Sequence, residues 1–125
     1  MPPLFLVMLG GAIGAGFRYH VGMVALRQLG PVFPFGTWMV NLLGGLLMGV
    51  LAGVVARSPV ETEPLRLFLG VGVLGGFTTF SAFSLESYEM LMRGDYVIAT
   101  AYAVSSVAGS VMMLFLGIAL ARALS

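Results

Sequence analysis

The chain has 125 residues, of which 59% are apolar and only 9% are charged. A soluble domain carries about 25% charged residues, so this composition excludes a water-facing surface and places most side chains in lipid. Six basic residues, all Arg, stand against five acidic ones, and this balance gives no indication of nucleic-acid binding. The absence of Cys excludes disulfides and thiolate chemistry. The length fits one domain over residues 1–125.

Four apolar stretches are each long enough to cross a bilayer as a helix, which takes about 20 residues. They cover residues 4–26, 35–56, 67–85 and 96–121. Their apolar runs are continuous rather than alternating, which is typical of helices and not of barrel strands. The sequence therefore predicts an all-α integral membrane protein with four transmembrane helices.

The distribution of Arg between the two ends of the predicted helices gives little bias for orientation. With four spans, both termini and the 57–66 loop share one side, which carries Arg57, Arg66 and Arg122. The other side carries Arg27 and Arg93. Cytoplasmic loops normally hold a clear excess of basic residues. The small difference permits insertion in both orientations and hence an antiparallel homodimer. A fixed topology decided by one Arg is the alternative.

The third stretch contains the segment Gly75-Gly76-Phe77-Thr78-Thr79-Phe80-Ser81, which is poor helix-forming sequence. A helix break inside a membrane is tolerated only where protein or a water-filled cavity satisfies the freed backbone groups. Freed carbonyls can bind a cation, and the amino end of a half-helix can face an anion. The segment predicts a broken third helix that forms part of a pore for a small anion. A Gly-rich continuous helix with close neighbours is the alternative.

Two aromatic residues follow the predicted break. Phe80 and Phe83 are three residues apart and therefore share a helix face. The edge of an aromatic ring is electropositive, so these rings are candidates for the lining of an anion path. Simple packing or lipid contact is the alternative interpretation.

Polar side chains in the second and fourth stretches are further candidates. Asn41 lies about one turn inside the second apolar run, where a polar amide is costly and is either functional or an interhelical hydrogen-bond partner. Tyr102, Ser106 and Ser110 recur every four residues and form one polar stripe on the fourth helix. Hydroxyl groups are rotatable donors that suit an anion. Close helix packing is the alternative for each Ser.

Arg18 lies within the first apolar stretch, where a charge is expensive and normally faces an interior or an aqueous cavity. Two roles are open for it: a charge that draws anions into a vestibule, or a partner for a carboxylate. Glu86, at the inner end of the third stretch, is the nearest candidate by depth. We expect the ion pair with Glu86.

No catalytic motif is present: the sequence contains no Gly-x-Ser-x-Gly, Walker loop, HExxH or Cys/His cluster. We therefore expect no enzyme. A small drug/proton antiporter with dual topology would fit the length, the span count and the weak charge bias. Such a carrier needs a carboxylate in its first span, where this chain has Arg18. A structural subunit of a membrane complex would explain the many Gly residues but not the clustered polar and aromatic candidates.

Along its whole length the chain resembles the Fluc fluoride channels, also called the CrcB family. Four stretches carry the resemblance: residues 10–19 (GGAIGAGFRY), 36–44 (GTWMVNLLG) and 75–86 (GGFTTFSAFSLE), and the spacing of Tyr102, Ser106 and Ser110. One departure is Ala82, which stands where many relatives have Thr.

The resemblance implies a passive, fluoride-selective channel in the bacterial inner membrane. It implies an antiparallel homodimer with two pores, each built from both subunits. The fluoride-pore positions that it implies are Asn41, Thr79, Phe80, Ser81, Phe83, Tyr102, Ser106 and Ser110. It further implies a structural sodium ion at the dimer centre, held by the backbone carbonyls of Gly75 and Thr78. Arg18 matches the Arg of the first-helix motif, without an assigned role.

Overall fold

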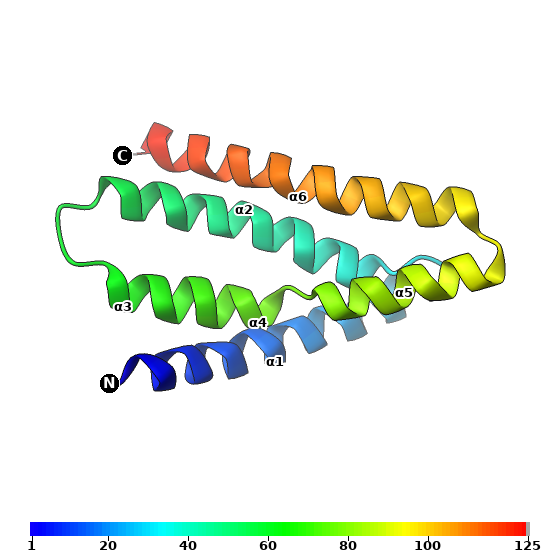
Figure 1. Ribbon diagram of the computed structural model, residues 1–125, viewed down its shortest axis with the longest axis horizontal. Helices are drawn as coiled ribbons and strands as arrows, with labels where there is room; N and C mark the ends of the chain where they lie inside the picture. Colours follow the sequence, from blue (N-terminus) through cyan, green and yellow to red (C-terminus); the bar gives the residue numbers. More distant parts are fainter. Residues whose placement is uncertain (125) are drawn as a thin grey trace.

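The computed structural model describes residues 1–124 and contains four long helical segments (Figure 1). These are α1 (Pro3–Leu29), α2 (Phe35–Arg57), a composite third segment (Glu63–Arg93) and α6 (Tyr96–Leu124). Each is long and apolar enough to cross a membrane. Within the described residues every regular element is helical, so the predicted helical class is confirmed.

The third segment is assembled from several pieces. It begins with α3 (Glu63–Leu65) and continues as the π-helix η1 (Arg66–Leu74), then α4 (Gly75–Phe77) and α5 (Phe80–Arg93). The wider winding of η1 extends to Gly75, whose N–H bonds the carbonyl five residues earlier. The sequence did not predict this π-helix.

The predicted interruption of the third helix is confirmed, and it lies at two residues. Thr78 has a ψ of 159° and Thr79 a φ of −150°, which is extended backbone. We call these two residues the helix break. After it, the Thr79 side chain accepts a hydrogen bond from the Ala82 N–H at 3.1 Å and so caps the amino end of α5.

Two glycines end helices in a conformation that other residues rarely adopt. Gly30 follows α1 with a φ of 81°, and Gly94 follows α5 with a φ of 83°. The Gly94 N–H bonds the carbonyls of Leu91 and Met90, which closes the last turn of α5. The chain can therefore reverse direction over very short connections at this end of the bundle.

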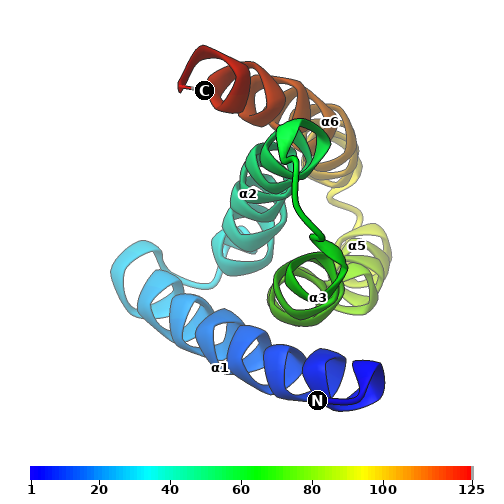
Figure 2. The same cartoon turned by 90° about the vertical axis from the view of Figure 1, so that its left-hand side faces the viewer.

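The helix break redirects the third segment from one neighbour to another. Before the break, η1 and α4 pack against α1; after it, α5 contacts α6. Helix α6 packs along α2, and α1 and α6 lie on opposite sides of the bundle (Figure 2). The break therefore lies where the third segment passes between the two sides.

Closely approaching glycines make this packing possible. A Cβ atom on Gly14 of α1 would meet the Val73 carbonyl and the Phe77 N–H. On the other side of the bundle, a Cβ atom on Gly49 of α2 would meet the Leu114 carbonyl of α6. These two glycines thus serve close helix contacts within one chain.

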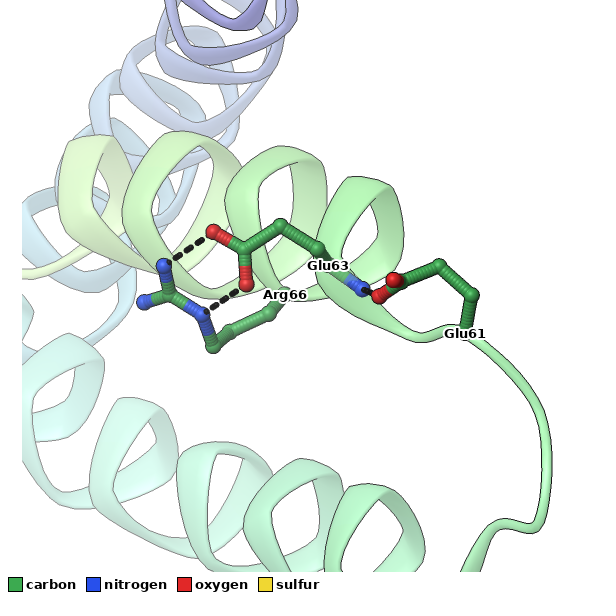
Figure 3. A network of polar contacts seen from close by, with 3 residues as sticks. All are labelled: Glu61, Glu63 and Arg66. Atoms are coloured by element: carbon green, nitrogen blue, oxygen red, sulfur yellow. Dashed lines mark hydrogen bonds and ion pairs between the residues drawn. The ribbon is translucent and has the colours of Figure 1, made fainter.

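Two ion pairs lie at the ends of the helices, one at each end. Both termini and the loop after α2 lie at one end, as expected for four spans (Figure 1). At that end Arg66 pairs with both oxygens of Glu63, at 3.0 and 2.7 Å, and the Glu63 N–H bonds Glu61 (Figure 3). At the other end Arg93 pairs with Asp95 at 3.2 Å. An Arg thus pairs with a carboxylate at each end of the bundle.

Candidate functional site

A side chain of α2 holds the helix break in place. Asn41 Oδ1 accepts a hydrogen bond from the Thr79 backbone N–H at 2.8 Å, and Asn41 Nδ2 donates to the Thr79 carbonyl at 3.0 Å. The amide nitrogen carries a second N–H, which no described protein acceptor uses. Asn41 therefore forms interhelical hydrogen bonds, as one of the two predicted roles requires. It also keeps one N–H donor for the other predicted role, contact with an ion.

The backbone carbonyls of Gly75 and Thr78, at the break, have no hydrogen-bond partner among the described residues. In a continuous helix the Gly75 carbonyl would accept from the Thr79 N–H, but that donor is used by Asn41. The Thr78 N–H and hydroxyl both donate to the Leu74 carbonyl, each at 3.0 Å, and the Thr78 carbonyl stays free. Free carbonyls of unwound helices are suitable sodium ligands. The residues predicted to hold sodium therefore fit that group.

Arg18 lies beside the same break, and its expected ion pair with Glu86 is wrong. Arg18 Nε donates to the Gly76 carbonyl at 3.0 Å. The Glu86 carboxylate instead accepts from the Thr37 hydroxyl at 3.1 Å and from the Tyr102 hydroxyl at 3.0 Å. The reason is the bend: α1 packs against the half of the third segment before the break, whereas Glu86 lies after it.

A groove of about 470 Å³ brings most of the predicted site residues together. Its walls come from α2, α6 and the third segment on both sides of the break. The predicted residues among its lining are Asn41, Gly75, Thr78, Thr79, Phe80, Phe83, Ser106 and Ser110. The others are Gly44, Gly45, Met48, Leu74, Val107, Val111 and Leu114. The lining of the groove is thus mostly apolar, with a few convergent polar groups.

The two Phe rings lie next to each other on this wall. The centroids of Phe80 and Phe83 are 5.5 Å apart, and Phe83 also lies 5.1 Å from the Tyr102 ring. Phe80 is 75% exposed within the single chain. One face of the groove is therefore open, and Phe80 has room to contact another molecule there.

The hydroxyls of the polar stripe differ in what they bind. Ser110 Oγ donates to the Asn41 carbonyl at 3.3 Å, and the buried Tyr102 hydroxyl donates to Glu86. Ser106 is buried and lines the groove, and its Oγ has no protein partner among the described residues. Of the three stripe residues, only Ser106 therefore has a side-chain hydroxyl without a protein partner among the described residues, and Tyr102 lies outside the groove lining.

Ser81, the last of the predicted pore hydroxyls, lies at the start of α5. Next to it is Ala82, the position at which many relatives have Thr. Ser81 is exposed, and its Oγ lies 3.3 Å from the Thr79 Oγ1. Ser81 does not line the groove of the single chain. Ala82 contributes its N–H to the Thr79 cap, and this contact does not depend on its side chain.

The sequence analysis missed the hydrogen-bonded group formed by Thr37, Glu86 and Tyr102. Glu86 lies inside the third helical segment, because α5 continues to Arg93 and not only to the predicted end at residue 85. A second cavity of about 310 Å³ adjoins it, with Thr37 and Glu86 among its lining. The available signal was spacing: Thr37 is one turn before Asn41, and Glu86 is three residues after Phe83.

Replacing Asn41 tests whether it holds the break. Asn41→Leu removes both hydrogen bonds to Thr79 and leaves the Thr79 N–H and the Thr79 carbonyl unpaired. We therefore expect a loss of about 2 kcal/mol in the free energy of unfolding. Thermal unfolding in detergent, followed by Trp38 fluorescence, measures it. Met39→Leu, an exposed position of the same helix, is the control and should change little. Equal stability of the two variants would contradict the role.

Comparison with known proteins identifies relatives over nearly the whole chain. The family model "CrcB-like protein, Camphor Resistance (CrcB)" matches residues 5–118. A protein of Sphingopyxis alaskensis is 50% identical over 124 residues, which cover 99% of this chain and 98% of the relative. One of Novosphingobium aromaticivorans is 55% identical over 118 residues, 93% of each chain. One of Phenylobacterium zucineum is 55% identical over 123 residues, 98% of this chain and 97% of the relative.

Each of these three relatives carries the name fluoride-specific ion channel FluC. The match covers all four helices and the break between them. The four membrane-spanning helices make the protein a multi-pass protein of the plasma membrane. The extent and identity of these matches show that the chain belongs to the CrcB family.

Proposed function

We propose that this protein is a fluoride-selective ion channel that lets fluoride leave the cell passively down its electrochemical gradient. One observation carries the proposal: Asn41, Phe80, Phe83 and Ser106, from three helices, all line the same groove. The names of its close relatives supply the ion. The protein is a channel and not an enzyme.

The chemistry of this wall suits a small, strongly hydrated anion. Such an ion must exchange part of its water shell for donors, and yet leave again. The spare Asn41 N–H and the Ser106 hydroxyl are uncharged donors, and the Phe ring edges are electropositive. No basic side chain lines the groove, so the ion is not bound too tightly to be released.

The antiporter alternative has less support. Its proton carrier would be a carboxylate in the first span, where α1 carries Arg18. Glu86, one of the two carboxylates of α5, accepts hydrogen bonds from both Thr37 and Tyr102. These donors come from α2 and α6, so the Glu86 carboxylate links neighbouring helices through hydrogen bonds.

The channel proposal is tested by fluoride efflux from liposomes, measured with a fluoride electrode and a potassium ionophore. Wild-type protein should release fluoride without a proton gradient and should leave chloride behind. Phe80→Leu removes the ring from the groove and should slow efflux by about tenfold, equivalent to about 1.4 kcal/mol. Phe115→Leu, a 69% exposed ring on α6 outside the groove, is the matched control. Equal chloride flux, or no fluoride flux, refutes the selective channel.

We further propose that the working unit is an antiparallel homodimer, with each of two pores built from both subunits. The open face of the groove and the 75% exposed Phe80 support this, because a single chain supplies only part of a pore wall. The weak Arg bias supports insertion in both orientations.

Dual topology is tested with one introduced thiol, since the chain has no Cys. Val60→Cys lies in the loop between α2 and α3 and is 69% exposed. A membrane-impermeant maleimide should label about half of the protein in sealed vesicles, and the rest only after permeabilisation. Complete labelling from one side would exclude the antiparallel arrangement.

The two free carbonyls of Gly75 and Thr78 support a structural sodium ion at the dimer centre. One chain offers two such oxygens, so a second copy would be needed to double the ligand set. A bound cation would supply positive charge that neutralises these carbonyl dipoles in the membrane.

The sodium proposal predicts that the dimer depends on the cation present. Exchanging sodium for N-methylglucamine, which is too large for a carbonyl cage, should lower fluoride efflux and the unfolding temperature in detergent. Restoring sodium should recover both, while the same ionic strength of choline should not. Full activity and stability without sodium would rule the site out.

A further inference from the structure

We propose that Arg18 serves this channel as a positioning residue that fixes the helix break through its Nε hydrogen bond to Gly76, and not as a charge that attracts anions. The inference rests on the proposed channel function, because its main measurement is fluoride efflux. The contact itself is a hydrogen bond of 3.0 Å between residues 58 positions apart.

Helix α1 packs so close to the third segment that the Nε atom of Arg18 is within reach of the Gly76 carbonyl. Gly14, one turn before Arg18, is buried where a Cβ would meet the backbone of Val73 and Phe77. Gly76 is equally close, since its Cβ would lie 2.5 Å from the Gly11 carbonyl. At this separation of the two backbones the Nε atom, rather than the end of the guanidinium group, reaches the Gly76 carbonyl.

The Gly76 carbonyl needs this donor because α4 ends at Phe77 and the helix break begins at Thr78. The last four carbonyls of a helix have no partner within it, and water is absent from the hydrocarbon region to replace one. Asn41 bonds Thr79, and Arg18 bonds Gly76. Without Arg18, the Gly76 carbonyl would join those of Gly75 and Thr78 as a free oxygen. Arg18 therefore determines which carbonyls of the break remain available.

The position of Arg18 argues against a direct role of its charge in the ion path. Arg18 is half-buried and lines neither the groove nor the second cavity. Its only described protein contact is the bond to Gly76. Neutral donors and ring edges, not this guanidinium, form the groove wall.

Two substitutions separate the hydrogen bond from the charge. Arg18→Gln keeps a donor nitrogen on Cδ, at the same place along the side chain as Nε, and removes the charge. Arg18→Lys keeps the charge but has a carbon at that place. We expect Arg18→Gln to keep fluoride efflux within about threefold of wild type and Arg18→Lys to lose about tenfold. Arg27→Gln, a charge removed near the end of the same helix, is the control and should conduct normally.

The unfolding temperature in detergent gives a second measurement that does not require conduction. It should fall in the order wild type, Arg18→Gln, Arg18→Lys. The ratio of wild-type to Arg18→Gln efflux should also be independent of ionic strength, because the contribution of a surface charge is screened by salt and that of a hydrogen bond is not.

The opposite pattern overturns the inference: Arg18→Lys active and stable, Arg18→Gln inactive or less stable. That result would assign Arg18 to charge-based anion attraction. If the wild-type protein itself failed to conduct fluoride, the proposed function would fail instead, and the order of unfolding temperatures would still decide the hydrogen-bond role.

Discussion

The requirement that every backbone polar group inside a bilayer finds a partner governs this structure. The helix of the third segment is interrupted at Thr78 and Thr79, which frees backbone polar groups that need partners. Asn41 from α2 satisfies Thr79, Arg18 from α1 satisfies Gly76, and the Thr78 hydroxyl turns back on its own helix. Two neighbouring helices therefore hold the break, and the carbonyls that they leave free are its candidates for a cation.

The same break also creates the groove. Because the third segment leaves α1 and approaches α6 after it, Phe80 and Phe83 come to lie opposite the hydroxyl stripe of α6. The tight glycine contacts hold the part of the third segment before the break against α1. The groove and the cluster of free carbonyls thus both arise from one interruption of the third helix.

The sequence predicted a large part of this arrangement, and the parts that it missed have a physical cause. Span positions follow from apolar run length, and the break follows from Gly and Thr, so both were readable. The π-winding of η1 was not, because π-helices are rare and residues 66–74 carry no sequence signal that distinguishes them from an α-helix. The Arg18–Glu86 pair failed because depth along a straight helix was used as the guide, whereas the bend separates the two residues.

Among the site residues, proximity was predictable and hydrogen-bond partners were not. The four-residue spacing on α6 placed Ser106 and Ser110 on one face, as the groove lining bears out. Spacing could not reveal that Tyr102 donates to Glu86 while Ser106 keeps its hydroxyl unpaired. Which donors remain for an ion depends on contacts between α2, α5 and α6, and these are set only when the chain is folded.

The account claims that the ion passes along the wall formed by Phe80 and Phe83 beside the break. Solid-state NMR on ring-labelled protein in lipid, with dipolar dephasing from bound ¹⁹F⁻ to the ¹³C-labelled Phe rings, measures this contact directly. The account predicts dephasing of the Phe80 and Phe83 signals, assigned by their loss in single Phe→Leu variants, and none at Phe115, an exposed ring outside the groove. Fluoride bound without contact to either groove ring would contradict it.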